Sequence, residues 1–129
     1  MTITPEITSS DFLKIVDIHI LNKIKLAEER ASEFTSISIK DSCEKFMMPC
    51  LLAIKIILDK VSEISEEKKY NAQETYDLLI YHIFMKSVEL EALKEKVIGV
   101  ISVTGLSLAQ LMCADIMEEI SLLIKENKG

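Results

Sequence analysis

The longest uncharged stretch of the chain is VIGVISVTGLSLAQLMCA, residues 97–114. Its eighteen residues reach the lower limit of length for a transmembrane helix. Four polar side chains interrupt it, and Gly105 followed by Leu106 is typical of a left-handed helix end. A helix end inside a bilayer would leave unpaired backbone groups in lipid. We therefore interpret residues 97–114 as the core of a helical bundle, with a membrane-embedded segment as the less favoured alternative.

The composition indicates a single folded domain made of helices. The chain has 129 residues, of which 49% are hydrophobic and 28% are charged. It contains only three glycines and two prolines, and long helices need fewer turns than strands do. We expect an all-α domain over residues 1–129, with residues 1–8 as a flexible lead and residues 125–129 as a fraying tail.

Apolar residues recur every three to four positions, and capping sequences separate the runs. Ser9 or Ser10 is the expected cap of the first helix, and residues 35–40 read as an extended linker. Pro49 should kink or split the second helix, because proline has no amide hydrogen to donate. The pattern predicts a bundle of four main helices over about residues 10–34, 41–68, 71–104 and 107–127.

The boundary between the last two helices is predicted from glycine and serine. Gly105 would end the third helix, and Ser107 with Gln110 would form a capping box for the fourth. A break at Gly99 is the alternative. Gly105, Ala109 and Cys113 recur at four-residue spacing, which favours close packing against another helix.

The third predicted helix carries apolar residues on two opposite faces. One face is formed by Tyr76, Leu79, Ile83, Leu90, Leu93 and Val97. The other is formed by Leu78, Tyr81, Met85, Val88 and Ala92. A helix of a monomeric bundle needs one apolar face, so a second is either covered inside the fold or left for a partner. We take the second set as a candidate interaction face.

Charge argues against direct nucleic-acid binding. The net charge is −6, and Arg30 is the only arginine beside 14 lysines, although guanidinium is the preferred group for phosphate and base edges. Abundant lysine and isoleucine with so little arginine are typical of an AT-rich genome. A helical subunit of a nucleoprotein complex, using Lys14, Lys23 and Lys25, is an alternative function.

The cysteines and histidines form no recognisable site. Cys43, Cys50 and Cys113 lack the close spacing of metal-binding cysteines, and they read as small apolar side chains in a reducing cytoplasm. His19 and His82 lack the partner glutamate of a helical di-metal site. We therefore predict no catalytic residues, no metal site and no cofactor.

One acidic pattern leaves an enzymatic alternative open. Glu63 and Glu66 share a helix face, as in magnesium-dependent all-α nucleotide hydrolases, and a second pair would have to come from Asp115 and Glu118. Solvated surface carboxylates are the simpler interpretation. The leading hypothesis is a non-enzymatic interaction or assembly module in the cytoplasm, self-associating, either a cellular adaptor or a viral accessory protein.

Overall fold

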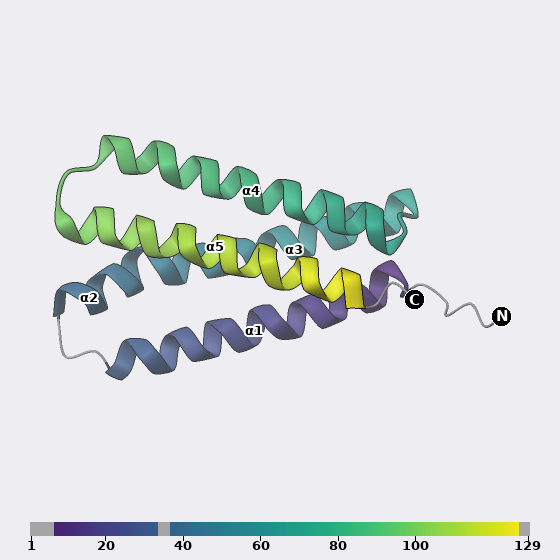
Figure 1. Cartoon of the computed structure of the whole chain (residues 1–129), viewed down its shortest axis with the longest axis horizontal. Helices are drawn as coiled ribbons and strands as arrows, with labels where there is room; N and C mark the ends of the chain where they lie inside the picture. The colour runs from purple at the N-terminus through teal and green to yellow at the C-terminus, as the bar shows by residue number, and fades with distance from the viewer. Residues whose placement is uncertain (1–6, 34–36, 127–129) are drawn as a thin grey trace.

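The computed structural model describes residues 7–33 and 37–126, and it contains no strand within them (Figure 1). The predicted all-α bundle of four main helices is confirmed, since four long helices make up most of the fold. The elements are α1 (Ser9–Glu33), α2 (Ile37–Ser42), a π-helical segment η1 (Cys43–Met47), α3 (Met48–Lys68), α4 (Ala72–Lys96) and α5 (Val100–Glu126). None of the helices in the described ranges is long and apolar enough to cross a membrane.

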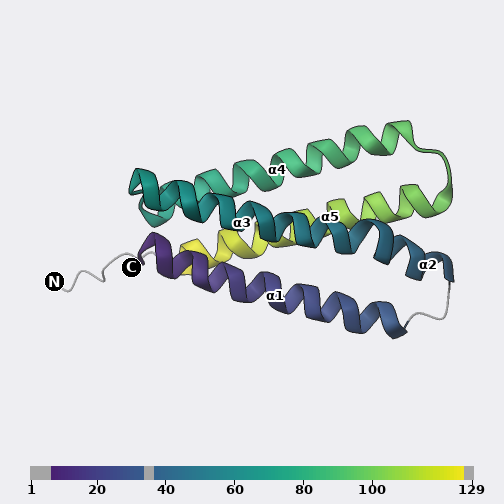
Figure 2. The same ribbon diagram turned by 180° about the vertical axis from the view of Figure 1, so that it is seen from behind.

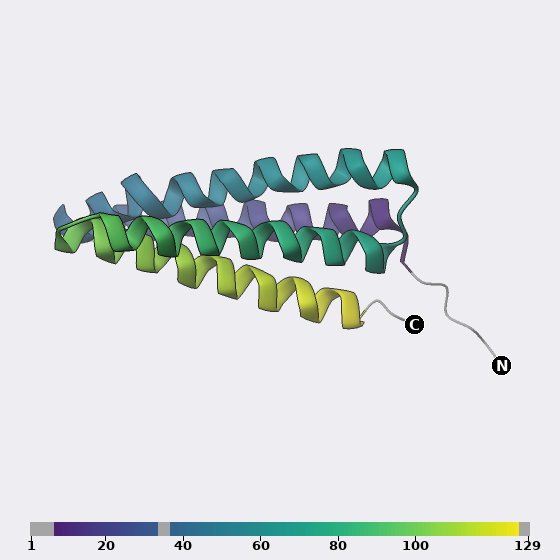
Figure 3. The same cartoon turned by 90° about the horizontal axis from the view of Figure 1, so that it is seen from above.

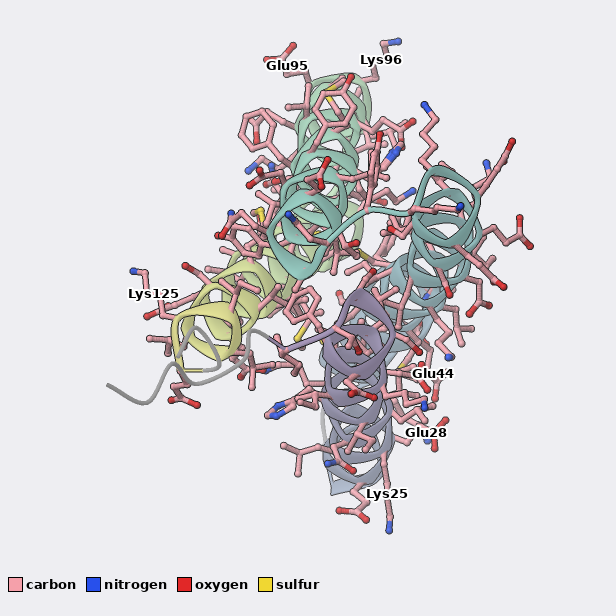
Figure 4. The ribbon with its side chains drawn as sticks, turned by 90° about the vertical axis from the view of Figure 1, so that its right-hand side faces the viewer. Lys25, Glu28, Glu44, Glu95, Lys96 and Lys125 are labelled. Carbon is pink, nitrogen blue, oxygen red and sulfur yellow. The ribbon has the colours of Figure 1, made fainter. Side chains whose placement is uncertain are left out.

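The four long helices run alternately up and down (Figures 1 and 2). Seen along the long axis in Figure 4, α4, α3, α1 and α5 are arranged in that order around a common centre. Seen from above in Figure 3, α4 lies nearest to the viewer. One side of α4 therefore faces away from the bundle, while its other side packs against α3 and α5.

The core is built from one apolar stripe of each long helix, as the helical spacing predicts. Its fully buried side chains include Phe12, Val16, Ile20, Leu51, Ile54, Val61, Leu79, Ile83, Ile116 and Ile120. A chain of hydroxyl groups ties three helices together at one end. Ser9 Oγ lies 2.6 Å from Thr75 Oγ1, which donates to Ser65 Oγ at 2.9 Å.

The start of α1 is capped one residue earlier than expected. Thr8 Oγ1 accepts a hydrogen bond from the amide of Asp11 at 3.1 Å, so the cap is Thr8 and not Ser9 or Ser10. Ile7, which falls within the expected flexible lead, is partly buried against the core. The rest of that lead, residues 1–6, and the last three residues of the expected tail lie outside the described residues.

The predicted extended linker is wrong for residues 37–40, because α2 occupies them and continues into η1 and α3. Residues 37–40 have no neighbouring strand to pair with in the described part of the chain, so their backbone groups bond within a helix instead. The predicted disturbance near Pro49 takes the form of a change in helix type. Pro49 lies in the first turn of α3, and the wider turns of η1 directly precede it.

The boundary between α4 and α5 lies at Gly99, and the predicted helix end at Gly105 is wrong. Gly99 has a φ of +118°, which favours glycine, and its carbonyl accepts from the amide of Val103 at 3.1 Å. Gly105 is buried inside α5, where an added Cβ would lie 2.3 Å from Cδ2 of Phe46. Ser107 lies within α5 and starts no helix. Gly105 is therefore a packing residue.

Candidate interaction surface

The inner side of α4 is fixed by its buried residues. Thr75, Leu79, Ile83 and Leu90 are buried, and they follow one another at helical spacing. Lys86 falls on the same stripe, between Ile83 and Leu90, and its side chain is 26% exposed. The only charged side chain between positions 81 and 88 is therefore largely covered, and its Nζ lies 3.4 Å from Oε2 of Glu89.

The outer side of α4 is apolar over the same two turns. Between positions 81 and 88, every exposed residue is apolar, and the polar or charged residues are all partly buried. Exposed fractions lie between 42% and 57% for Tyr81, Phe84, Met85 and Val88. Ala92 is exposed one turn further on. We call these five residues the α4 apolar surface.

The sequence-derived interaction face matches this surface in four of its five members. Tyr81, Met85, Val88 and Ala92 are exposed, whereas Leu78 is partly buried and packs against the core. Phe84 was missed, although it lies three residues after Tyr81 and four before Val88, the spacing that places side chains on one helix face. The second apolar face of this helix therefore exists on the molecular surface.

Hydrogen bonds between polar groups of α4 and Gln110 of α5 join the two helices beside this surface. The amide of Gln110 donates to Glu91 Oε2 at 2.7 Å and to the carbonyl of Ser87 at 3.5 Å, while its oxygen accepts from Lys94 Nζ at 3.0 Å. The hydrogen bond from Gln110, helped by the charge of Lys94, lowers the pKa of the Glu91 carboxyl. Gln110 was predicted to cap a helix, but it joins two helices instead.

Charged groups border the α4 apolar surface at both ends. Glu74 and Asp77 are exposed before Tyr81, and Glu95 and Lys96 are exposed after Ala92. Figure 4 shows Glu95 and Lys96 projecting away from the bundle at the far end of α4. An apolar centre with a charged border is the usual composition of a protein–protein interface.

A second group of exposed apolar residues lies on α1 and α3. Its members are Ile18, Leu21, Leu52 and Ile56, and an ion pair between Lys55 and Asp17 joins the two helices beside them. All four are aliphatic, whereas the α4 apolar surface contains two aromatic residues and a methionine. Aromatic residues and methionine are enriched at interfaces, so α4 is the stronger candidate.

A groove of about 700 Å³ opens between the start of α1 and the end of α3. Its charged lining residues are three lysines and three acids: Lys14, Lys55, Lys69, Asp17, Asp59 and Glu66. Lys55 is already paired with both aspartates. Opposite charges that neutralise one another leave no field of one sign to hold a charged ligand.

The lysines of the nucleic-acid alternative do not form one patch. Lys23 Nζ lies 2.9 Å from Glu119 of α5, and Lys14 Nζ lies 4.0 Å from Asp11. Lys25 is exposed near the far end of α1, where it projects away from the other helices (Figure 4). Two of these three charges therefore lie beside carboxylates, which lowers the positive charge that the three lysines present to a phosphate backbone.

The acidic residues considered for catalysis lie as two pairs on two different helices. Glu63 and Glu66 are exposed on α3, and Asp115 and Glu118 are exposed on α5. Within residues 7–33 and 37–126, no three histidine, cysteine or acidic side chains gather as metal ligands. His19 Nδ1 lies 4.0 Å from Glu119, and the ring of His82 contacts Tyr81 edge-on at 5.4 Å between centroids.

In comparisons with known proteins, no family model, curated protein or solved structure matches the chain.

Proposed function

We propose that this protein is a non-enzymatic assembly module that self-associates through the α4 apolar surface. The observation that carries the proposal is the set of exposed apolar side chains on α4 between positions 81 and 88. There the exposed side chains are apolar, and the charged Lys86 lies on the inner stripe. A helix that only had to cover its own core would place polar residues at these exposed positions.

A second copy of the chain fits this surface because the surface is neutral and apolar. Two copies related by a two-fold axis present the same patch to each other. Tyr81, Phe84, Met85 and Val88 together expose on the order of 400 Å², which suits the centre of an interface of about 800 Å² per copy. The nearest exposed carboxylates, Glu89 and Glu91, are paired with Lys86 and Lys94, so contact between the two patches buries no unpaired charge.

The net charge of the chain gives this association a specific salt dependence. Each copy carries a net charge of −6, so two copies repel one another at a distance. Added salt screens that repulsion, and it does not weaken an apolar contact. Self-association through the α4 apolar surface should therefore become tighter as the salt concentration rises.

Replacing Met85 by glutamate tests the proposal. The substitution would place an uncompensated carboxylate at the centre of the interface, at a cost of about 3–5 kcal/mol, or about 150- to 5,000-fold in the dissociation constant. Sedimentation velocity or light scattering over a concentration series should show a dimer or larger particle for the natural chain and a monomer for Met85→Glu. Circular dichroism checks that the variant stays helical.

Ile56→Glu is the matched control, because Ile56 is 62% exposed on α3, away from the α4 apolar surface. This variant should keep the particle size of the natural chain. Dissociation by Ile56→Glu but not by Met85→Glu would move the interface to α1 and α3. A natural chain that stays monomeric at high concentration would refute self-association and leave a different protein as the partner.

A further inference from the structure

Two cysteines that are far apart in the sequence meet in the core. Cys50 Sγ of α3 lies 3.7 Å from Cys113 Sγ of α5, and the two residues are 3% and 0% exposed. Both are free thiols. The pairing links residues 63 positions apart, and neither the spacing of the cysteines nor their local sequence indicates it.

Small residues on α5 allow this approach. Gly105, Ala109 and Cys113 are all buried, and they lie one helical turn apart along the side of α5 that packs against η1 and α3. The thiol of Cys50 donates to the carbonyl of Ala109 at 3.9 Å, one turn before Cys113. Because these side chains are short, the two helices lie close enough for cysteine side chains to touch.

The distance between the two sulfur atoms is within reach of a disulfide bond. A disulfide has a sulfur–sulfur length of about 2.05 Å, so the two atoms would have to approach by about 1.6 Å. Rotation about the Cα–Cβ bond of one or both cysteines moves sulfur by distances of this order while the helices stay in place. The approach that the two sulfur atoms must make is therefore of the size that side-chain rotation supplies.

The surroundings also help one of the thiols to lose its proton. The hydrogen bond from Cys113 lowers the pKa of Cys50 against the opposing effect of burial, and the charge of Lys86 adds to the lowering. The same hydrogen bond, together with burial, raises the pKa of Cys113. Cys50 is therefore the thiolate-forming member of the pair, and Cys113 keeps the proton that stabilises it.

We propose that Cys50 and Cys113 form a paired oxidation site, at which a peroxide or a small-molecule disulfide produces an intrachain disulfide bond that joins α3 to α5. With a peroxide, the Cys50 thiolate attacks one oxygen and becomes a sulfenic acid, and the other oxygen leaves as hydroxide. The Cys113 thiol then attacks the Cys50 sulfur, and the oxygen leaves with a proton as water. The protein loses two electrons and two protons in total, and the peroxide is reduced to water.

A small-molecule disulfide reaches the same product through exchange. The Cys50 thiolate attacks one sulfur of the oxidant and releases a thiolate, which leaves a mixed disulfide on Cys50. Cys113, after losing its proton to solvent, attacks the Cys50 sulfur and releases the second thiol. Because both cysteines are buried, each route proceeds during local opening of the bundle, so oxidation should be slow compared with that of an exposed thiol.

The test uses the full chain with Cys43 replaced by serine, which leaves only the two cysteines of the pair. The protein is incubated in glutathione buffers of increasing oxidised fraction until the thiol content is constant. We expect the free thiols to fall from two to none, with a mass loss of two hydrogen atoms and a peptide that joins Cys50 to Cys113. The product should run as a single chain without reducing agent, and its melting temperature should rise by about 5–15 °C.

Two further variants make the test decisive. Cys113→Ser, in the same background, should form at most a mixed disulfide with glutathione and should show no rise in melting temperature. Lys86→Met should slow the oxidation several-fold at neutral pH and less at high pH, because the thiolate then forms without the help of its charge. Two thiols that stay free at equilibrium in fully oxidised glutathione would overturn the proposal. So would a product that carries glutathione on Cys50 and leaves Cys113 free.

Discussion

Replacing Gly105 by alanine has two opposite effects on stability, a gain from helix propensity and a loss from steric contact. In an exposed helix this change stabilises the protein by about 1 kcal/mol, because glycine loses more backbone freedom on folding. In α5 the new Cβ would lie 2.3 Å from Cδ2, 2.7 Å from Cγ and 2.8 Å from Cβ of Phe46. The last of these atoms is attached to the backbone of η1, so rotation of the Phe46 ring does not relieve the contact.

The steric cost should exceed the gain in propensity. Overpacking of this kind costs about 1–3 kcal/mol, and α5 would have to move away from η1 to accept the methyl group. We expect Gly105→Ala to lower the free energy of unfolding by up to about 2 kcal/mol and the melting temperature by up to about 8 °C. Urea denaturation followed by circular dichroism at 222 nm, the usual helix signal, measures the change.

A double-mutant cycle with Phe46→Ala identifies the cause. Removing the phenyl ring eliminates the two shortest contacts, so Gly105→Ala should cost less by about 1 kcal/mol or more in the Phe46→Ala background. Gly99→Ala is the control, because no atom lies within 4 Å of its added Cβ and its cost comes from a φ of +118°. That cost should not depend on Phe46. A Gly105→Ala variant more stable than the natural chain would refute the packing argument.

Three other substitutions test single interactions. Asn71→Ala removes the side chain that accepts from the amide of Glu74 at 2.8 Å, and urea denaturation should show a loss of about 1 kcal/mol. Thr75→Val leaves the buried hydroxyl of Ser65 without its donor, and it should cost about 1–3 kcal/mol by the same measurement, whereas Thr75→Ser should cost less. Removing the Gln110 amide as Gln110→Ala should raise the pKa of Glu91 in a carbon-detected NMR titration, since the hydrogen bond from Gln110 is the main cause of its lowered value. The pKa of Glu91 is lower in the folded state than in the unfolded state. Its contribution to stability is therefore present above the unfolded pKa and is lost as the pH falls through the folded pKa. The stability difference between Gln110→Ala and the natural chain should accordingly shrink in acid.

The local sequence determined the helical class and most helix positions. The apolar periodicity of the long helices and the scarcity of glycine and proline leave no other regular structure that could bury these side chains. The capping box of Asn71 and Glu74 and the disturbance at Pro49 are also local, because they involve groups within one helical turn. The second apolar face of α4 follows from the same periodicity, which is why most of its residues were found from the sequence.

Only the tertiary structure decided the role of residues whose partners are distant in the chain. Gly105 resembles a helix end in the local sequence, but Phe46, on another helix, makes it a packing residue. Gln110 resembles a cap, but Glu91 makes it a link between α4 and α5. Cys50 and Cys113 give no local signal of a pair, because their contact exists only when the start of α3 packs against α5. The sequence shows which residues form an apolar side of each helix. The contacts between helices depend on how these apolar sides pack together in three dimensions.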